Sequence, residues 1–183
     1  LAKEGGNTIL EASPLFRPEY REAWSKFDLA QANKLLDSIG LTQRDGEGVR
    51  LLPDGRPLEI VVETAGQSPE ESDVLELIAD SWRAVGIQLF QKASERDYLR
   101  NRIFSGATIM AVWTGLENGI VTADFSPQEL APTSQQQLEW PKWGQYTETA
   151  GDSGEKVDTP DAEHLEGLLV EWRHATTREA RAD

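Results

Sequence analysis

Three apolar segments alternate with amphipathic helices between residues 58 and 113, and this alternation constrains the fold more than any other feature. Strands are predicted at 58–64, 87–91 and 108–113, where apolar and β-branched residues gather. The last run is almost wholly apolar, which is typical of a strand buried on both faces. Strands that alternate with helices form βαβ units. We therefore predict an α/β fold, an open mixed sheet with helices on its faces.

Capping residues predict where the helices begin and end. Glycines at 40, 86 and 106 are expected to end the first three helices. Pro53–Gly55 predicts the turn of a hairpin over 49–58. The segment 135–159 lacks periodicity, and a connection of that length is usually functional or partly disordered. The predicted helix starts are Asp28, Ser68, Ser94, Ser126, Thr159 and Thr176.

The charge balance narrows the partners. The chain has 18 Lys and Arg against 32 Asp and Glu, for a formal net charge of −14. This excess disfavours nucleic acid and anionic membrane surfaces as partners. The chain has no cysteine, and His164 and His174 lie too far apart for a helical metal pair. We expect no metal, no cofactor, and no insertion into a membrane.

The candidate binding residues follow the last predicted strand. Ligands of open α/β sheets bind at the carboxyl ends of the strands. Trp113 and Thr114 end this strand, and Glu117 and Asn118 follow in a loop bounded by glycines. An indole offers a stacking face, a carboxylate pairs with an amine, and an amide bonds a carbonyl or hydroxyl. The alternative is a solvated turn at Asn118 and Gly119.

Two further tryptophans, Trp140 and Trp143, lie in the aperiodic segment and are also candidate ligand contacts. They either stack against a solute or cover a sheet edge. Trp82 and Trp172 fall on apolar helix faces, where core packing is expected.

Enzyme signals are weak, and we predict no catalytic residue. The chain has no nucleophile elbow, P-loop or dinucleotide fingerprint. The alternative function is a glycoside or peptide hydrolase that uses Glu117 and Asp124 as paired carboxylates. A third hypothesis is a structural module without a small ligand.

Several segments together resemble a known family. Residues 28–41 carry a DLAQANKLLDSIGL helix, and residues 51–58 carry an LLPDGRPL hairpin. The order of elements over 58–115 and the WPKWGQ string at 140–145 are similar to the same family. This family is the extracellular solute-binding proteins of family 5, the oligopeptide and dipeptide type of ABC importers.

The resemblance implies one lobe of a type II periplasmic binding protein fold, in a monomeric two-lobed receptor. Such a receptor closes around a peptide or other small solute in the periplasm and delivers it to a membrane permease. Residues 28–183 would form the C-terminal lobe, and residues 1–27 would lead in from the other lobe. Glu117 is the nearest candidate to hold a peptide amine. Leu1 at the start and a capping pattern at 176–179 near the end suggest a fragment of a longer protein, and the resemblance implies that this protein is exported.

Overall fold

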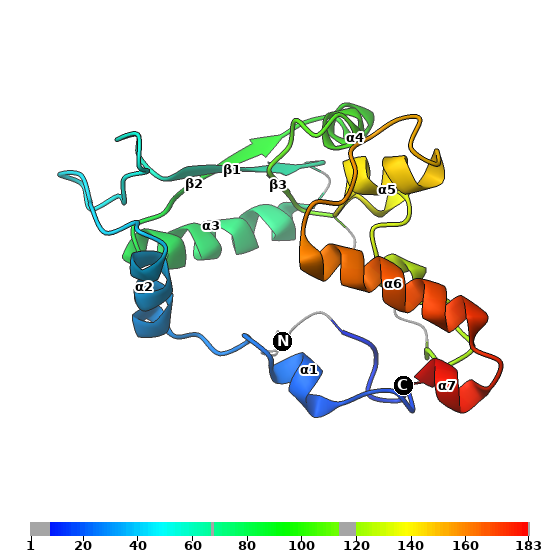
Figure 1. The fold of residues 1–183 in the computed structure, drawn as a ribbon. Helices are drawn as coiled ribbons and strands as arrows, with labels where there is room; N and C mark the ends of the chain where they lie inside the picture. Colours follow the sequence, from blue (N-terminus) through cyan, green and yellow to red (C-terminus); the bar gives the residue numbers. More distant parts are fainter. Residues whose placement is uncertain (1–7, 67, 114–119, 183) are drawn as a thin grey trace. The chain divides into compact units, whose positions relative to one another are not determined.

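The computed structural model describes residues 8–66, 68–113 and 120–182 (Figure 1). The chain divides into two compact units. We call Phe27–Arg102 with Ala107–Trp113 the sheet unit, and Leu1–Lys26, Ile103–Gly106 and Thr114–Asp183 the helical unit. In chain order the elements are α1 (Pro18–Glu22), α2 (Leu29–Ser38), β1 (Glu59–Thr64), α3 (Pro69–Ala84), β2 (Gln88–Ala93), α4 (Arg96–Phe104), β3 (Met110–Ala111), η1 (Gln128–Leu130), η2 (Gln135–Gln137), α5 (Pro141–Glu148), α6 (Pro160–His174) and α7 (Arg178–Ala182).

The sheet unit contains the predicted βαβ units. Its strands are parallel and lie in the order β2-β1-β3, with Val61 opposite Phe90 and Val62 opposite Met110. Helix α3 runs along one face of the sheet (Figure 1), where it buries Leu75 to 4% exposure. The predicted α/β fold class is confirmed. Antiparallel pairing among the described residues outside the named strands is confined to isolated bridges near the hairpin, Arg44 with Arg50 and Leu51 with Pro57.

The last strand is shorter and less buried than predicted. β3 spans Met110–Ala111 rather than 108–113, and Ile109 is 95% exposed. The prediction of a strand buried on both faces is wrong. β3 is an edge strand that pairs only with β1 among the described strands. Its other edge and part of the apolar segment 108–113 are therefore not covered by the described residues.

The helix caps are partly as predicted. Asp28 accepts the Gln31 amide at 2.9 Å, and Ser68 accepts the Glu71 amide at 3.4 Å. Ser94 was the wrong cap: the Glu95 carboxylate accepts the Asp97 and Tyr98 amides, at 2.8 and 3.2 Å. The longer side chain of Glu95 reaches the amides that a cap at Ser94 would bind. The capping pattern in the sequence therefore does not distinguish the two residues.

Of the three later helix starts, Thr159 is confirmed, while Ser126 and Thr176 differ from prediction. Ser126 precedes only the short 3-10 helix η1, which has no side-chain cap. Thr159 stands at the start of α6 without a side-chain cap bond. At α7 the capping hydroxyl is that of Thr177, which accepts the Ala180 amide at 3.2 Å, and not that of Thr176. Where Thr159 makes no such bond, Pro160 at the first helical position favours the helix start.

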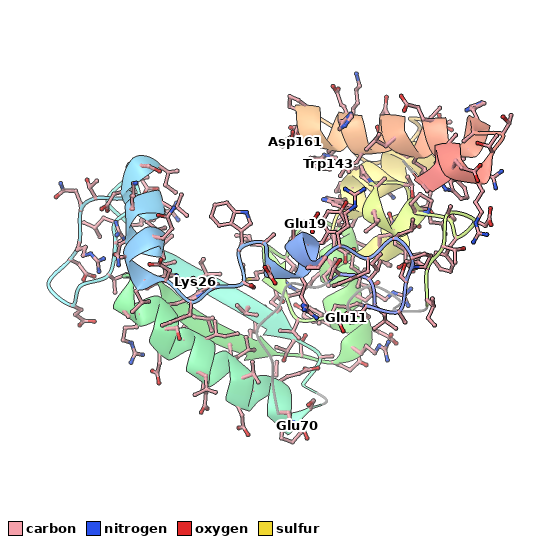
Figure 2. The ribbon with its side chains drawn as sticks, turned by 90° about the horizontal axis from the view of Figure 1, so that it is seen from below. Glu11, Glu19, Lys26, Glu70, Trp143 and Asp161 are labelled. Carbon is pink, nitrogen blue, oxygen red and sulfur yellow. The ribbon has the colours of Figure 1, made fainter. Side chains whose placement is uncertain are left out.

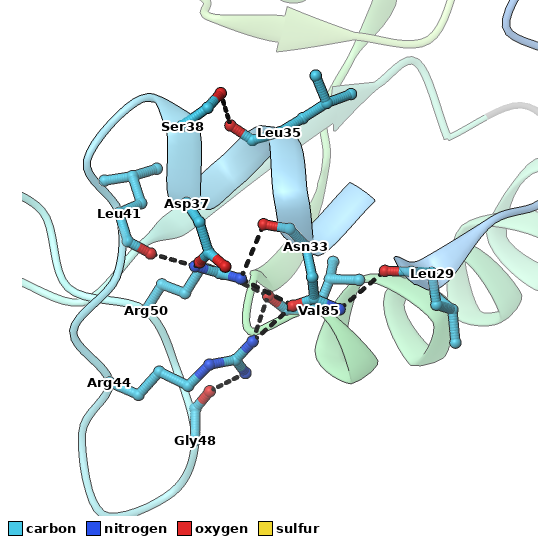
Figure 3. A network of polar contacts seen from close by, with 10 residues as sticks. All are labelled: Leu29, Asn33, Leu35, Asp37, Ser38, Leu41, Arg44, Gly48, Arg50 and Val85. Carbon is cyan, nitrogen blue, oxygen red and sulfur yellow. Dashed lines mark hydrogen bonds and ion pairs between the residues drawn. The ribbon is translucent and has the colours of Figure 1, made fainter. Parts of the chain in front are cut away.

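A buried arginine joins the hairpin to two helices of the sheet unit (Figure 3). Arg50 is 2% exposed. Its guanidinium donates to the Val85 carbonyl at 2.8 Å, the Asn33 side chain at 2.7 Å and the Asp37 carboxylate at 2.6 Å. It also donates to the Leu41 carbonyl. The network therefore fixes α2 and the end of α3 to the strand-entry side of the sheet.

The prediction of an aperiodic connection over 135–159 is wrong for part of this segment. It contains η2 and α5. Gly144 faces the backbone of Ser134 so closely that a Cβ would lie 2.3 Å from it. Gly154 approaches the Lys142 carbonyl, where a Cβ would lie at 2.4 Å. Contacts of glycine with backbone have no apolar periodicity, so a hydrophobic pattern does not reveal them.

Candidate functional site

A buried carboxylate organises the carboxyl end of the central strand. Glu63, near the end of β1, is 3% exposed. Arg102 of α4 donates to its two oxygens at 2.8 and 2.9 Å, and the Thr108 hydroxyl lies at 3.2 Å. The Lys92 ammonium of β2 lies at 3.5 Å. We call Glu63, Lys92, Arg102 and Thr108 the Glu63 cluster.

The hydrogen bond from Arg102 lowers the pKa of the Glu63 carboxyl below its ordinary value of 4.5, against the opposing effect of burial. The backbone carbonyl of Glu63 also accepts the Val112 amide at 2.9 Å. One residue thus fixes α4 and the segment that leads to Trp113. Its charge is balanced within the cluster, which suits a positioning role at the strand ends rather than acid–base chemistry.

Trp113 lies beside a cation of the same unit. The guanidinium carbon of Arg96, the first residue of α4, lies 5.0 Å from the centroid of the Trp113 ring. This distance is in the range of a cation–π contact. Trp113 is half-buried and Arg96 is exposed. No carboxylate among the described residues forms an ion pair with Arg96.

The structure describes only some of the other residues that were predicted to lie near this strand end. Thr114, Glu117 and Asn118 lie outside the described residues. Asp124, the second carboxylate of the hydrolase alternative, is exposed and forms ion pairs with Arg178 at 3.5 Å and Arg181 at 3.1 Å. The described residues therefore give Asp124 two cationic partners and provide no geometry for a catalytic pair.

Trp140 and Trp143 belong to the helical unit. Trp143 lies on α5 rather than on a loop (Figure 2), and Trp140 is the residue immediately before that helix. Both are half-buried. The expectation that both tryptophans lie on an irregular loop is wrong for Trp143, because Pro141 begins a helix there. Their role as ligand contacts stays a prediction.

Sequence reasoning missed the residues that organise the site, Glu63 and Arg96. Glu63 lies in an alternating strand, where a charged residue is expected to face solvent. Arg96 lies seventeen positions before Trp113 in the sequence. The only sequence signal for the Glu63 cluster is a glutamate within a valine-rich strand, followed later by an Arg-rich helix. This signal is weak.

Within the described ranges, no group of three or more His, Cys, Asp or Glu side chains is arranged to hold a metal ion. No helix in the same ranges has the length and apolarity to cross a membrane.

Comparison with known families identifies one match. The profile described as "Bacterial extracellular solute-binding proteins, family 5 Middle" matches residues 1–136. A comparison with curated protein sequences found no match.

Solved structures give the same fold. An oligopeptide-binding protein, OppA, is 26% identical with a TM-score of 0.80, over 100% of this chain and 31% of that chain. MelB of Agrobacterium fabrum, a periplasmic binding protein solved with stachyose, is 17% identical with a TM-score of 0.72, over 98% of this chain and 26% of that chain. NikA of Brucella suis, solved with Fe(III)-EDTA, is 20% identical with a TM-score of 0.61, over 95% and 31%. The chain thus spans about a third of the length of these proteins or less.

Proposed function

Because the chain belongs to family 5 of the bacterial extracellular solute-binding proteins, we propose that it is part of the solute receptor of an ABC import system. The match over residues 1–136 is the observation that carries the proposal. The receptor captures a peptide or another small solute in the periplasm and delivers it to the permease without catalysis. The similarity to OppA over the whole chain supports a peptide. We propose that residues 28–183 form one lobe and that residues 1–27 lead in from the other.

The proposed site is the carboxyl end of the strands. Trp113 supplies a stacking face, while Glu117, Asn118 and Thr114 supply polar contacts. Trp140 and Trp143 are further proposed ligand contacts. Closure follows when a solute makes contacts in the closed state that the open state lacks. The Glu63 cluster supports this proposal because it holds the segment before Trp113 to the central strand.

The test uses a receptor of family length that contains this chain. Mass spectrometry of co-purified solutes identifies the natural ligand, and calorimetry with tri-alanine and with stachyose compares a peptide with a sugar. We expect saturable binding of one class and no turnover of either. Turnover of the peptide or the sugar would support the hydrolase alternative, and binding of neither, with no co-purified solute, would contradict a receptor.

Trp113→Ala separates a ligand contact from a core residue. If the indole stacks on the solute, the affinity should fall by about 1–3 kcal/mol, by loose analogy with base–aromatic stacking. If Trp113 is a core residue, the unfolding free energy should fall by about 3–5 kcal/mol instead. Thermal unfolding and titration on the same variant distinguish these results. A large fall in melting temperature with unchanged affinity would contradict the proposed contact.

A further inference from the structure

A cavity of about 300 Å³ lies in the helical unit, between α5, α6 and the loop 150–157. We call it the α5–α6 pocket. Figure 1 shows α5 in yellow and α6 in orange, joined by the connection that contains this loop. All of the lining residues belong to the helical unit, and none of them is a residue of the proposed solute site. Its volume is at the lower end of the range for small-molecule sites, which fits a small ligand.

One part of the lining is apolar and buried. Val157 is 5% exposed and Leu169 is 3% exposed. An apolar group placed against these side chains leaves water and gains the free energy of apolar burial. The pocket therefore favours a ligand with a compact hydrocarbon part.

Another part of the lining is cationic and unpaired. Lys156 and Arg173 both line the pocket, and neither pairs with a carboxylate among the described residues. This is notable in a chain with 32 acidic and 18 basic side chains. The carboxylate in the lining, Glu166, accepts a hydrogen bond from the Thr147 hydroxyl at 2.8 Å. Two cations and one carboxylate leave a formal charge of +1.

The lining also has a free donor on a fixed scaffold. Tyr146 lines the pocket, and its hydroxyl forms no hydrogen bond with the described residues. The loop that carries Lys156 is fixed to α5, because the Glu155 amide donates to the Lys142 carbonyl at 3.0 Å. The hydroxyl of Thr149 donates to the Ser153 carbonyl at 3.0 Å. The loop is therefore positioned before any ligand arrives, which lowers the entropy cost of binding.

We propose that the α5–α6 pocket binds a small amphipathic monoanion, a carboxylate attached to a compact apolar group. Lys156 and Arg173 hold the carboxylate and the Tyr146 hydroxyl donates to it. Val157 and Leu169 cover the apolar group. A free organic acid and the C-terminal residue of a peptide share this chemistry. This site is additional to the proposed solute site.

The experiment is a titration of the 183-residue chain, labelled with ¹⁵N, followed by NMR amide shifts. Benzoate represents a free acid, N-acetyl-leucine represents a peptide terminus, and benzamide is the uncharged match of benzoate. We expect benzoate or N-acetyl-leucine to shift the amides of Lys156, Val157 and Arg173, and the tighter of the two identifies the source. Benzamide should bind at least about tenfold more weakly, since the charge-assisted hydrogen bonds are lost.

Variants test the charges in both directions. Arg173→Gln should weaken benzoate binding about tenfold, while Glu166→Gln should tighten it about threefold because it removes a like charge. Lys34→Gln, the same charge change on α2 in the sheet unit, should leave the affinity unchanged. Equal affinities for benzoate and benzamide, shifts confined to other residues, or weaker binding by Glu166→Gln would each overturn the proposal. None of these outcomes depends on the strand-end site, so the proposed function is tested separately.

Discussion

Two buried charges hold the sheet unit together at opposite ends of its strands, and they do so in different ways. Arg50 lies at the amino ends, where its amide donates to the Gly86 carbonyl, and it binds mainly backbone carbonyls and an amide side chain (Figure 3). Glu63 lies at the carboxyl end of β1 and is held by the side chains of Arg102, Lys92 and Thr108.

Because of this difference, we expect the Arg50 network to depend less on pH and salt than the Glu63 cluster does. Most partners of Arg50 are backbone carbonyls and an amide, which do not titrate, and the exception is the exposed carboxylate of Asp37 at 2.6 Å. Lys92 is 45% exposed and Arg102 is 28% exposed, so the charges around Glu63 are open to solvent and to salt. The Glu63 cluster lies at the end of the sheet where ligands of α/β folds bind.

The largest effect is expected for Arg50→Met. Removal of the guanidinium leaves the Leu41 carbonyl without its donor. It also takes one of two donors from the Val85 carbonyl and from the Asn33 side chain, which keep only Arg44. A buried polar group left without its partner costs about 1–3 kcal/mol of unfolding free energy, and several buried atoms lose a hydrogen bond here at once, so the loss should lie at the upper end of this range or above it. Urea unfolding, monitored by circular dichroism, measures this change.

The control is Arg44→Met. The exposed Arg44 donates to the same Val85 carbonyl, at 3.1 Å, and to the Asn33 side chain. Its removal should cost clearly less, since water replaces its bonds. Equal losses for the two variants would contradict the role of Arg50 as the buried anchor.

The second effect is expected for Glu63→Gln, and it should depend on pH. The pKa of Glu63 is lowered in the fold by the hydrogen bond from Arg102. The stabilisation is therefore complete above the unfolded pKa and is lost as pH falls through the folded pKa. At pH 7 the variant should lose about 1–3 kcal/mol of unfolding free energy.

The measurement is urea unfolding of wild type and Glu63→Gln at pH 7 and at about pH 3, which lies below the ordinary carboxyl value. The difference between the two proteins should narrow at the lower pH, because the unfolded wild-type carboxyl is protonated there and the contribution of Glu63 is lost as pH falls toward the lowered pKa of the folded state. It should also narrow in high salt at pH 7. A difference that is independent of pH and salt would mean that the charge of Glu63 does not contribute and that the side chain acts by packing.

The sequence predicted the parts of this molecule that depend on local periodicity and capping. The order from β1 to β3 and the caps Asp28 and Ser68 follow from residues that are near one another in the chain. The fold class followed from their alternation. The family resemblance came from the same segments, and the family is confirmed by the match over residues 1–136.

The rest depends on contacts between distant residues or on backbone proximity. Arg50 reaches Val85 across 35 positions, and Arg102 reaches Glu63 across 39. Gly144 allows α5 and η2 to pack by the absence of a side chain. The candidate site was predicted only as a place: the strand end and Trp113 were named, while the partners Glu63 and Arg96 were not.

The smallest effect is expected for Arg96→Gln, beside Trp113. The contact with Trp113 is that of an exposed cation–π pair, which contributes about 0.5–1 kcal/mol. Arg96 is also the first residue of α4, where a cation opposes the helix dipole by about 0.3–1 kcal/mol. The two contributions nearly cancel, so the unfolding free energy should change by less than about 0.5 kcal/mol. The indole environment should nevertheless change, and ¹⁹F NMR with fluorotryptophan should show a shift for Trp113 and none for Trp172. A loss above about 2 kcal/mol would show that Arg96 supports the fold as Arg50 does, and would remove the distinction between the two ends of the sheet.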